Sequence, residues 1–345
     1  MKTVLVTDHV FPNLDPENAV LKDIGTLREA GSINDAELLE LARDADAVLN
    51  CYRPLSVGIV EAMKNCRIIA RYGIGVDTIP LEVATSRGIH VTNVPDYCIE
   101  EVADHGLALI LAFTRGIIRG LDQTRGGGWN VKSLRPLHRQ RGQTLGLVGF
   151  GRIARALAHR ARALGYEIII SDPFVSDESV RNGGARAVDL DTLFKESDVV
   201  SLHAPLTPKT RHMVNAERLA TMRPGAVLVN TSRGGLVDYE AVVAALRDGT
   251  LGGAGLDVLE TEPPEANSTA ISKVPNLVVT PHLGFYSEQA LVELQRKAAE
   301  QVRAVLEGRT PDYPVNNLWP TVPAAFRRSD EAASPAHARQ VERRA

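Results

Sequence analysis

The chain has 345 residues, of which 44% are hydrophobic and 23% charged, and this composition is typical of a globular protein. Its formal net charge of −3 favours neither nucleic acid nor an anionic membrane surface as a partner. The length exceeds what one hydrophobic core usually serves, so the sequence predicts two domains.

The cysteines and the start of the chain indicate a cellular compartment. Cys51, Cys66 and Cys98 follow no metal-ligand spacing, and their odd number is typical of a reducing environment. The first apolar run is interrupted by the charged Asp8 and is too short for a secretion signal. No apolar run reaches the about 20 residues that a membrane helix needs. We therefore expect a cytoplasmic protein without a metal, a nucleic acid partner or membrane contact.

Over residues 1–100, short runs rich in β-branched residues alternate with helical patterns. These patterns predict strands at residues 4–6, 47–49, 67–70 and 89–91, and helices at 35–43 and 57–64. Such an alternation predicts a parallel sheet. A longer apolar-periodic segment at residues 99–124, closed by glycines at 126–128, predicts one helix that connects two domains.

A second alternating series begins near Thr144 and predicts a doubly wound sheet. Its strands are expected at residues 145–149, 167–171, 199–203, 226–230, 254–258 and 277–280, with helices centred near Leu157, Leu219, Val243 and Val292. Residues 321–345 are rich in Ala, Arg, Ser, Pro and Glu without an apolar period. This composition predicts a disordered tail.

The first strand of this series runs into a glycine turn and then an amphipathic helix. Gly149 permits a tight turn, Gly151 lets the backbone approach a pyrophosphate, and Ala154 is small enough for the helix to pack on the strand. The anion is expected at the N-terminus of the helix, where Arg152 and Ile153 stand, because free N–H groups and the helix dipole favour it there.

The next strand ends in Asp172, about 20 residues further on, where an acid binds ribose hydroxyls. A carboxylate there also repels a 2′-phosphate, and residues 173–175 supply no arginine, so we expect NAD rather than NADP. The alternative is a glycine turn that binds nothing, with Asp172 as a solvated loop acid.

Polar residues follow three successive strands of the second series: Arg233, Glu262 and His282. Ligands bind at the carboxyl ends of such strands. Reduction of a 2-keto acid needs a cation for the substrate and a proton donor with a pKa near neutrality, which histidine provides, while a carboxylate orients the ring. Each residue also has an ordinary interpretation as a polar residue in a surface loop. His203 ends another strand and competes as the acid, whereas His105 is expected to be structural.

At these residues the chain resembles the D-2-hydroxyacid dehydrogenase family. The matching stretches follow the family's order and are residues 71–77, 149–154, 203–207, 230–235, 256–258, 262–264 and 281–282. Residues 285–290 and 308–311 are most similar to the C-terminal-binding-protein-like branch, which includes NAD(H)-sensing transcriptional corepressors. The resemblance implies an NAD-dependent dehydrogenase that acts as a 2-keto acid reductase. The alternative is an NAD(H)-sensing dimeric binding protein like the corepressors.

The family fold implied by this resemblance has two doubly wound parallel-sheet α/β domains. A Rossmann NAD domain at residues 101–287 is inserted into a flavodoxin-like substrate domain made of residues 1–100 and 288–320. Family members are usually dimers that pair through the NAD domains and the connecting helix. We therefore expect a homodimer with a small 2-keto or 2-hydroxy acid as substrate.

The resemblance also implies roles for single residues. Arg233 would bind the substrate and polarise its carbonyl, His282 would be the general acid/base, and Glu262 would pair with His282. Backbone N–H groups of Gly73, Ile74 and Gly75 would bind the substrate carboxylate. Further cofactor contacts are implied for His203, Ala204, Thr231, Ser232 and Asp257, the last of which would hold the nicotinamide carboxamide.

The chain departs from its relatives at positions that bear on the substrate. Ile74 stands where many relatives have Ser or Thr, and Phe285 stands where the corepressor branch has tryptophan. Tyr52, Arg53 and Tyr72 fit several substrates, and Arg53 either meets a phosphate or caps a loop. The sequence therefore leaves open which acid is used and whether it is phosphorylated.

Overall fold

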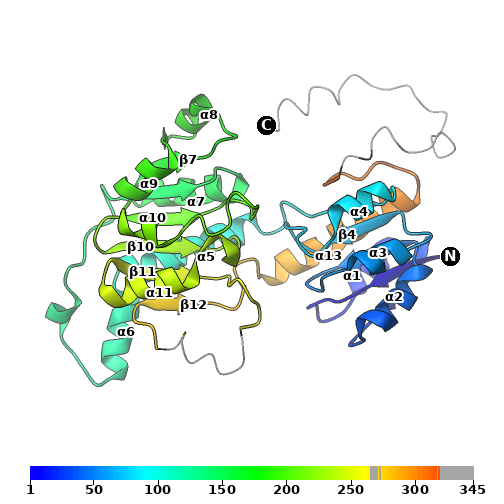
Figure 1. Cartoon of the computed structure of the whole chain (residues 1–345), viewed down its shortest axis with the longest axis horizontal. Helices are drawn as coiled ribbons and strands as arrows, with labels where there is room; N and C mark the ends of the chain where they lie inside the picture. The colour runs from blue at the N-terminus through cyan, green and yellow to red at the C-terminus, as the bar shows by residue number, and fades with distance from the viewer. Residues whose placement is uncertain (265–270, 272, 317, 319–345) are drawn as a thin grey trace. The chain divides into compact units, whose positions relative to one another are not determined.

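The computed structural model describes residues 1–264, 271, 273–316 and 318. The chain forms two compact units, which divide at Tyr97/Cys98 and again at Tyr286/Ser287 (Figure 1). Unit 1 contains the first segment and the described residues from Ser287 onward, and unit 2 contains the segment between them. The sequence placed the divisions after residues 100 and 287, and its predicted tail at 321–345 lies outside the described residues.

Unit 1 contains a parallel sheet in the order β2-β1-β3-β4-β5, which is the flavodoxin-like arrangement. Its described strands are β1 (Lys2–Val6), β2 (Gly25–Glu29), β3 (Ala47–Asn50), β4 (Ile68–Arg71) and β5 (His90–Thr92). Its described helices are α1 (Asp15–Leu21), α2 (Asp35–Arg43), α3 (Val57–Ala62), α4 (Leu81–Ser86) and α13 (Glu288–Leu306).

Helix α2 shows how local sequence fixes an element of this unit. The Asn34 side chain accepts a hydrogen bond from the Glu37 backbone N–H at 3.0 Å, and the Glu37 carboxylate accepts one from the Asn34 backbone N–H at 3.0 Å. This capping box satisfies two backbone donors that the first turn would leave unpaired. The helix then buries Leu38 and Ala42 against the sheet, and its bounds equal the predicted ones.

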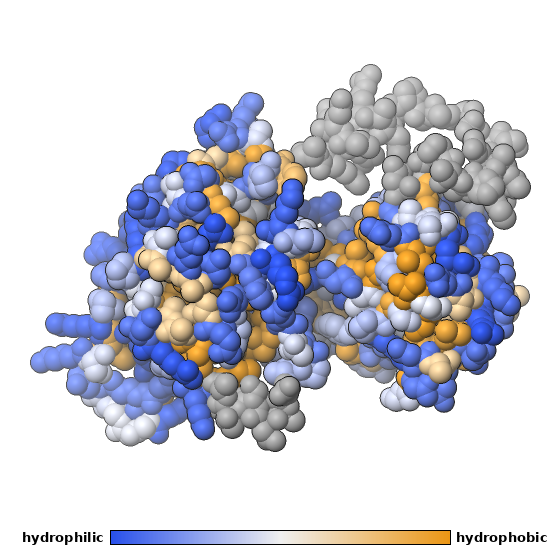
Figure 2. Space-filling model, in the orientation of Figure 1, coloured by the Kyte–Doolittle hydropathy of each residue, from blue (hydrophilic) through white to orange (hydrophobic). Residues whose placement is uncertain are grey.

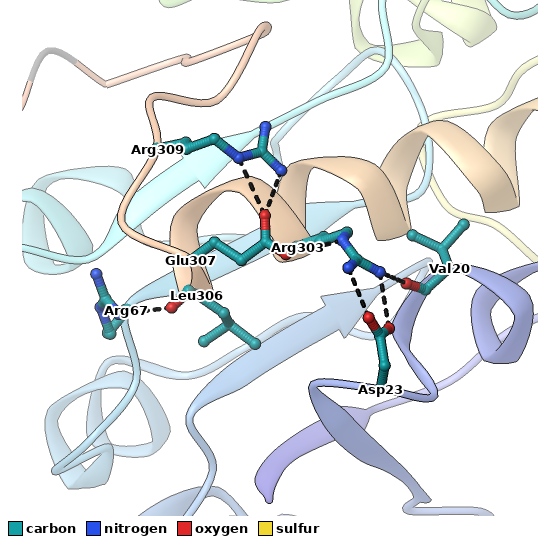
Figure 3. Close-up of polar contacts among 7 residues, drawn as sticks. All are labelled: Val20, Asp23, Arg67, Arg303, Leu306, Glu307 and Arg309. Carbon is teal, nitrogen blue, oxygen red and sulfur yellow. Dashed lines mark hydrogen bonds and ion pairs between the residues drawn. The ribbon is translucent and has the colours of Figure 1, made fainter.

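The returning helix α13 is attached to the N-terminal part of unit 1 by charged side chains (Figure 3). Arg303 donates to the carbonyl of Val20 at 2.6 Å and to both carboxylate oxygens of Asp23 at 2.8 and 2.7 Å. Arg67 donates to the carbonyl of Leu306 at the end of the helix. Figure 1 shows α13 beside α1, with which it packs.

A buried polar network also joins these elements. Glu17 on α1 has no exposed surface, and it accepts hydrogen bonds from the Tyr72 hydroxyl at 2.7 Å and the Gln295 amide at 2.9 Å. Burial raises the pKa of Glu17 above its usual value, although these hydrogen bonds act in the opposite direction. Glu17 therefore connects α13 to the chain that follows β4.

Unit 2 contains a parallel sheet in the order β12-β11-β10-β9-β6-β7-β8, in which the chain reverses direction between β6 and β9 as in a Rossmann fold. Its described strands are β6 (Thr144–Val148), β7 (Glu167–Ser171), β8 (Arg186–Ala187), β9 (Val199–Leu202), β10 (Ala226–Asn230), β11 (Leu251–Leu256) and β12 (Leu277–Val279). Its described α-helices are α5 (Ile99–Thr114), α6 (Ile117–Arg125), α7 (Arg152–Ala163), α8 (Asp177–Asn182), α9 (Leu190–Glu196), α10 (Ala216–Ala220) and α11 (Tyr239–Asp248).

Every residue of β6 and β10 is buried, as expected for central strands covered by helices on both faces. One core cluster contains residues of α5 and α7, and a second contains residues of α9, α10 and α11. On the face in view in Figure 2, hydrophilic residues cover most of unit 2 and hydrophobic ones form smaller patches. None of the described helices has the length and apolarity to cross a membrane.

The prediction of one helix over residues 99–124 was wrong, because the segment forms two helices. Gly116 adopts a left-handed backbone with φ +67°, and its N–H bonds the carbonyl of Phe113 at 2.8 Å, which ends α5. A Cβ at Gly116 would lie 2.9 Å from Leu137, so a glycine also fits the space. Helix α6 then begins at Ile117 and has no buried residue.

Candidate active site

The two glycines of the turn after β6 differ in their surroundings, because one is packed against protein backbone and the other faces open space. Gly149 has φ +95°, and a Cβ there would lie 2.7 Å from the carbonyl oxygen of His203. Gly151, at the N-cap of α7, faces open space, because no described atom lies within 4 Å of a Cβ built there. The backbone at Gly151 is therefore accessible to a ligand.

Helix α7 begins without a side-chain cap, so its first N–H groups can bind an anion. Arg152 is exposed, Ile153 is half-buried, and Ala154 is fully buried against the sheet. Asp172 follows β7, and its carboxylate accepts hydrogen bonds from the backbone N–H groups of Phe150 at 2.8 Å and Phe174 at 2.9 Å. These bonds hold the acid beside the glycine turn and leave each oxygen a lone pair for a hydroxyl.

The loop after β10 is fixed by its own polar side chains. Asn230 has no exposed surface; it donates to the carbonyl of Arg233 at 2.8 Å and accepts from the Ser232 N–H at 3.0 Å. Ser232 in turn donates to the carbonyl of Leu202 at 2.7 Å. The hydroxyl of Thr231 is buried without a hydrogen-bond partner among the described residues. Leaving such a group unpaired costs about 1–3 kcal/mol, so this loop fits a bound ligand that supplies the missing partner.

His203, predicted both as a cofactor contact and as a rival acid, follows β9. Its ring Nε2 lies 2.9 Å from the hydroxyl of Ser201, and its backbone N–H bonds the carbonyl of Val148 at 2.8 Å. Burial lowers the pKa of His203 to about 4, so the ring is neutral at neutral pH. A general acid works best when its pKa is near the working pH, which argues against His203 as the proton donor. Ala204, next in the chain, is half-buried.

The loop that carries Arg233 packs directly on the loop that follows β11. A Cβ at Gly234 would lie 1.9 Å from the carbonyl carbon of Leu259, so only glycine allows this approach. The Arg233 guanidinium donates to the carbonyl of Ser232 at 2.7 Å. Packing of the two loops brings the segments that carry Arg233 and Glu262 together.

Glu262 and His282 form a short side-chain contact in the site. The Glu262 Oε2 lies 2.7 Å from Nδ1 of His282, and Oε1 accepts a hydrogen bond from the Leu259 N–H at 2.7 Å. Burial raises the pKa of Glu262, but the hydrogen bond and charge of His282, together with the hydrogen bond from the Leu259 N–H, hold that pKa below its usual value. Because an ionised carboxylate carries no hydrogen, Nδ1 is the protonated nitrogen, and Nε2 is the atom that can exchange a proton with a ligand.

The turn that carries His282 is anchored by Asp257, which is only 2% exposed. The Asp257 carboxylate accepts hydrogen bonds from the Thr280 hydroxyl at 2.5 Å and from the N–H groups of Leu283 and Gly284 at 3.0 and 2.8 Å. His282 itself has φ +52°, and its N–H bonds the carbonyl of Asp257 at 2.9 Å. The anchor thus holds a strained backbone of the kind found at functional sites.

His105 on α5 also contacts this anchor, as expected for the structural role given to it in the sequence analysis. Its Nε2 lies 3.1 Å from the Thr280 hydroxyl and 3.4 Å from Oδ1 of Asp257. Burial alone would raise the pKa of Asp257, but the hydrogen bonds from His105, Thr280 and the backbone keep it below the usual value. The family resemblance implied a nicotinamide contact for Asp257, and the sequence showed no sign of this anchoring role, because nothing local to residue 257 indicates a partner at 280–284.

Comparison with known proteins identifies the family of the chain. Residues 107–284 match the model of the family described as D-isomer specific 2-hydroxyacid dehydrogenase, NAD binding domain. The chain belongs to this family. The glycine turn, Asp172 and the unpaired Thr231 hydroxyl fit the NAD that this domain of the dehydrogenase family binds.

Relatives of this dehydrogenase extend the match beyond the NAD domain. It is 40% identical to a glyoxylate reductase of Thermococcus litoralis, over 81% of this chain and 86% of the relative. It is 36% identical to a D-3-phosphoglycerate dehydrogenase of Methanocaldococcus jannaschii over 94% of this chain, but spans only 60% of that protein. A structure of Aquifex aeolicus D-lactate dehydrogenase, complexed with NAD and lactic acid, has a TM-score of 0.79 at 29% identity, covering 88% of this chain and 96% of that one.

The remaining predicted substrate residues of the dehydrogenase lie in unit 1, after β4. Gly73 has φ +144°, and its N–H bonds the carbonyl of Arg71 at 3.0 Å. The carbonyl of Ile74 accepts a hydrogen bond from the Asn93 amide at 2.7 Å, and Gly75 follows it. Arg53 donates to Asp35 at 2.9 Å. Of the two roles left open for Arg53, this contact corresponds to the fixing of a loop.

Proposed function

We propose that this dehydrogenase reduces a small 2-keto acid with NADH and oxidises the corresponding D-2-hydroxy acid with NAD. The observation that carries the proposal is the 2.7 Å contact of Glu262 with His282, beside the loop that holds Arg233. An imidazole fixed by a carboxylate and a nearby guanidinium are the groups that carbonyl reduction needs from a protein. They follow β10, β11 and β12 at the carboxyl edge of the sheet, where such folds bind ligands.

Each residue has a defined part in the proposed reaction. Bound NADH supplies the hydride. His282 gives the proton on Nε2 to the carbonyl oxygen, and takes it back when the hydroxy acid is oxidised. Glu262 holds Nδ1–H and stabilises the charged ring, while Arg233 binds the substrate and polarises its carbonyl. Binding of the substrate carboxylate by the N–H groups of Gly73, Ile74 and Gly75 stays a prediction that the family resemblance implies.

The proposed cofactor site follows the same edge of unit 2. The pyrophosphate lies against the accessible backbone of Gly151 and the first turn of α7. The Asp172 carboxylate accepts hydrogen bonds from the ribose hydroxyls. A 2′-phosphate is disfavoured by that carboxylate. The other residues proposed to contact NAD are Gly149, Arg152, Ile153, His203, Ala204, Thr231, Ser232 and Asp257.

NADH oxidation tests the proposed activity. The purified full chain is assayed with glyoxylate, hydroxypyruvate, pyruvate and bulkier 2-keto acids, each with NADH and with NADPH, and with the hydroxy acids in reverse. We expect turnover of at least one small acid and a preference for NADH. Tight NADH binding without turnover of any acid would contradict the reductase and favour the alternative, an NAD(H)-sensing binding protein.

We also propose that the protein is a homodimer that pairs through α6. This helix buries none of its residues, and hydrophobic side chains in and after it are exposed, Leu121 to 44%, Trp129 to 92% and Val131 to 77%. A cavity of about 560 Å³ lies between α6 and residues 273–279. An exposed apolar surface of this kind is typical of an interface.

Light scattering after size-exclusion chromatography measures the oligomeric state against the 37.3 kDa chain mass. We expect a dimer, and a monomer for the double variant Leu121→Asp, Trp129→Ser. The control Phe174→Ser removes an equally exposed aromatic ring outside this surface and should leave the mass unchanged. Cys51 and Cys66 are buried thiols outside any disulfide, which supports a further proposal, a cytoplasmic location.

A further inference from the structure

A second cluster of charged side chains contacts the loop that carries Glu262. Glu260 pairs through Oε1 with the guanidinium of Arg211, and its Oε2 lies 3.0 Å from Nε2 of His212. Arg211 and His212 belong to the segment that follows β9, whereas Glu260 belongs to the loop that follows β11. The contact therefore crosses the loop after β10, in which Arg233 lies.

The backbone of the segment that carries Arg211 and His212 is hydrogen-bonded to the loop that follows β10. The His212 N–H bonds the carbonyl of Gly235 at 2.8 Å, and the Val214 N–H bonds that of Leu236 at 3.0 Å. On the other side of this loop, Gly234 lies against the backbone of Leu259. The three loops are thus stacked, and the side-chain contact joins the outer two.

We propose that Arg211, His212 and Glu260, here named the strand-end clamp, are positioning residues that hold Glu262 against His282. This inference rests on the proposed function. Glu262 reaches His282 only while the backbone of its loop keeps its place, since the Leu259 N–H binds the other carboxylate oxygen. Without the clamp, ordering this exposed loop costs conformational entropy in every turnover.

The clamp does not touch the reacting atoms, so its loss should alter kcat more than binding. For Glu260→Ala we expect kcat to fall roughly tenfold or more, with little change in the Kd of NADH and in KM. Glu260→Gln keeps an acceptor for His212 and should retain more activity than Glu260→Ala. The matched control is Glu196→Ala, which removes the Arg186–Glu196 pair, of similar exposure, elsewhere in unit 2, and should leave kcat unchanged.

A double-mutant cycle tests whether the clamp acts through Glu262. In a Glu262→Gln background, Glu260→Ala should lower kcat by less than twofold, because the contact that it positions is already lost. If Glu260→Ala lowers kcat by the same factor in the Glu262→Gln background as in the wild type, the proposal is overturned. An unchanged kcat in Glu260→Ala alone would also overturn it. Thermal unfolding identifies any variant whose loss of activity comes from loss of folded protein.

Proton NMR supplies a readout that needs no turnover. The Nδ1–H of His282, held by Glu262, should give a slowly exchanging low-field resonance, assigned by its absence in His282→Asn. We expect Glu260→Ala to broaden or remove this resonance and Glu196→Ala to retain it. A sharp resonance in Glu260→Ala would refute the clamp. An inactive wild-type chain in which the resonance still depends on Glu260 would refute the proposed reaction alone.

Discussion

The carboxylate of Glu262 lies 2.7 Å from Nδ1 of His282, although the two residues are 20 positions apart in the chain. The strand β12 lies between them in the sequence and places both at the same edge of the sheet. The contact fixes the tautomer of the ring, so the chemistry proposed for this dehydrogenase depends on one hydrogen bond between two partly exposed side chains.

The first prediction concerns the two members of this contact. His282→Asn should lower kcat by about 10²–10⁴-fold, because general acid–base catalysis contributes that much. Glu262→Gln keeps the size of the side chain but not its charge, and should lower kcat less. Steady-state kinetics with the preferred keto acid measures both, and the Kd of NADH should change little. Full activity of His282→Asn would mean that another group donates the proton.

The two glycines of the nucleotide turn should respond differently to alanine. Gly149→Ala places a methyl group 2.7 Å from the carbonyl of His203 on a left-handed backbone, and should destabilise unit 2 by about 1–3 kcal/mol. In Gly151→Ala the added methyl group has no described atom within 4 Å apart from its chain neighbours, so the stability of the variant should equal that of the wild type while its affinity for NADH falls. Chemical unfolding and NADH titration separate the two effects. Unaltered NADH affinity in Gly151→Ala would place the pyrophosphate elsewhere.

His203 should make the stability of unit 2 depend on pH. Its folded-state pKa of about 4 lies below the value of 6.5 for a free ring, so between these values the unfolded chain binds the extra proton. Stability should therefore fall as the pH drops through this window, by up to about 3 kcal/mol. Urea unfolding at pH 7 and pH 5 should show a smaller loss in His203→Gln. The exposed His159 provides the control variant His159→Gln, which should behave as the wild type.

Glu17 should have the opposite effect in unit 1. Its folded-state pKa is raised, so the folded chain binds the extra proton above pH 4.5 and loses stability as the pH rises through the raised value. Glu17→Gln stays neutral, and the stability difference between wild type and variant should shift in favour of the variant with rising pH. The control is Glu40→Gln, on the exposed face of α2. A pH-independent difference for Glu17→Gln would contradict the assignment.

Local signals predicted the central elements well. The capping box at Asn34 and the apolar spacing after it fix α2, and the fully apolar run of β10 marks a buried strand. The strands that the sequence did not predict are β2 and β8, which form edges of the two sheets. Only the first residue of β2 is buried, and β8 has two residues, neither of them buried, so these two segments lack the apolar pattern that burial imposes.

The candidate site was only partly accessible from sequence. Arg233, Glu262 and His282 could be proposed because each follows a strand, and parallel strands end at one edge. The Asp257 anchor and the strand-end clamp could not, because their partners come from distant segments without a motif. The low pKa of His203 results from desolvation of its ring, which only packing determines.

The return of the chain to unit 1 has a consequence for its synthesis. Residues 1–97 leave the ribosome long before α13, yet Glu17, Val20 and Asp23 bind side chains of that helix. Unit 2 is one continuous stretch and can therefore complete its fold first. Until α13 is made, residues 1–97 lack the helix that packs on β3 and β4, and we expect chaperones to bind the nascent chain at this stage.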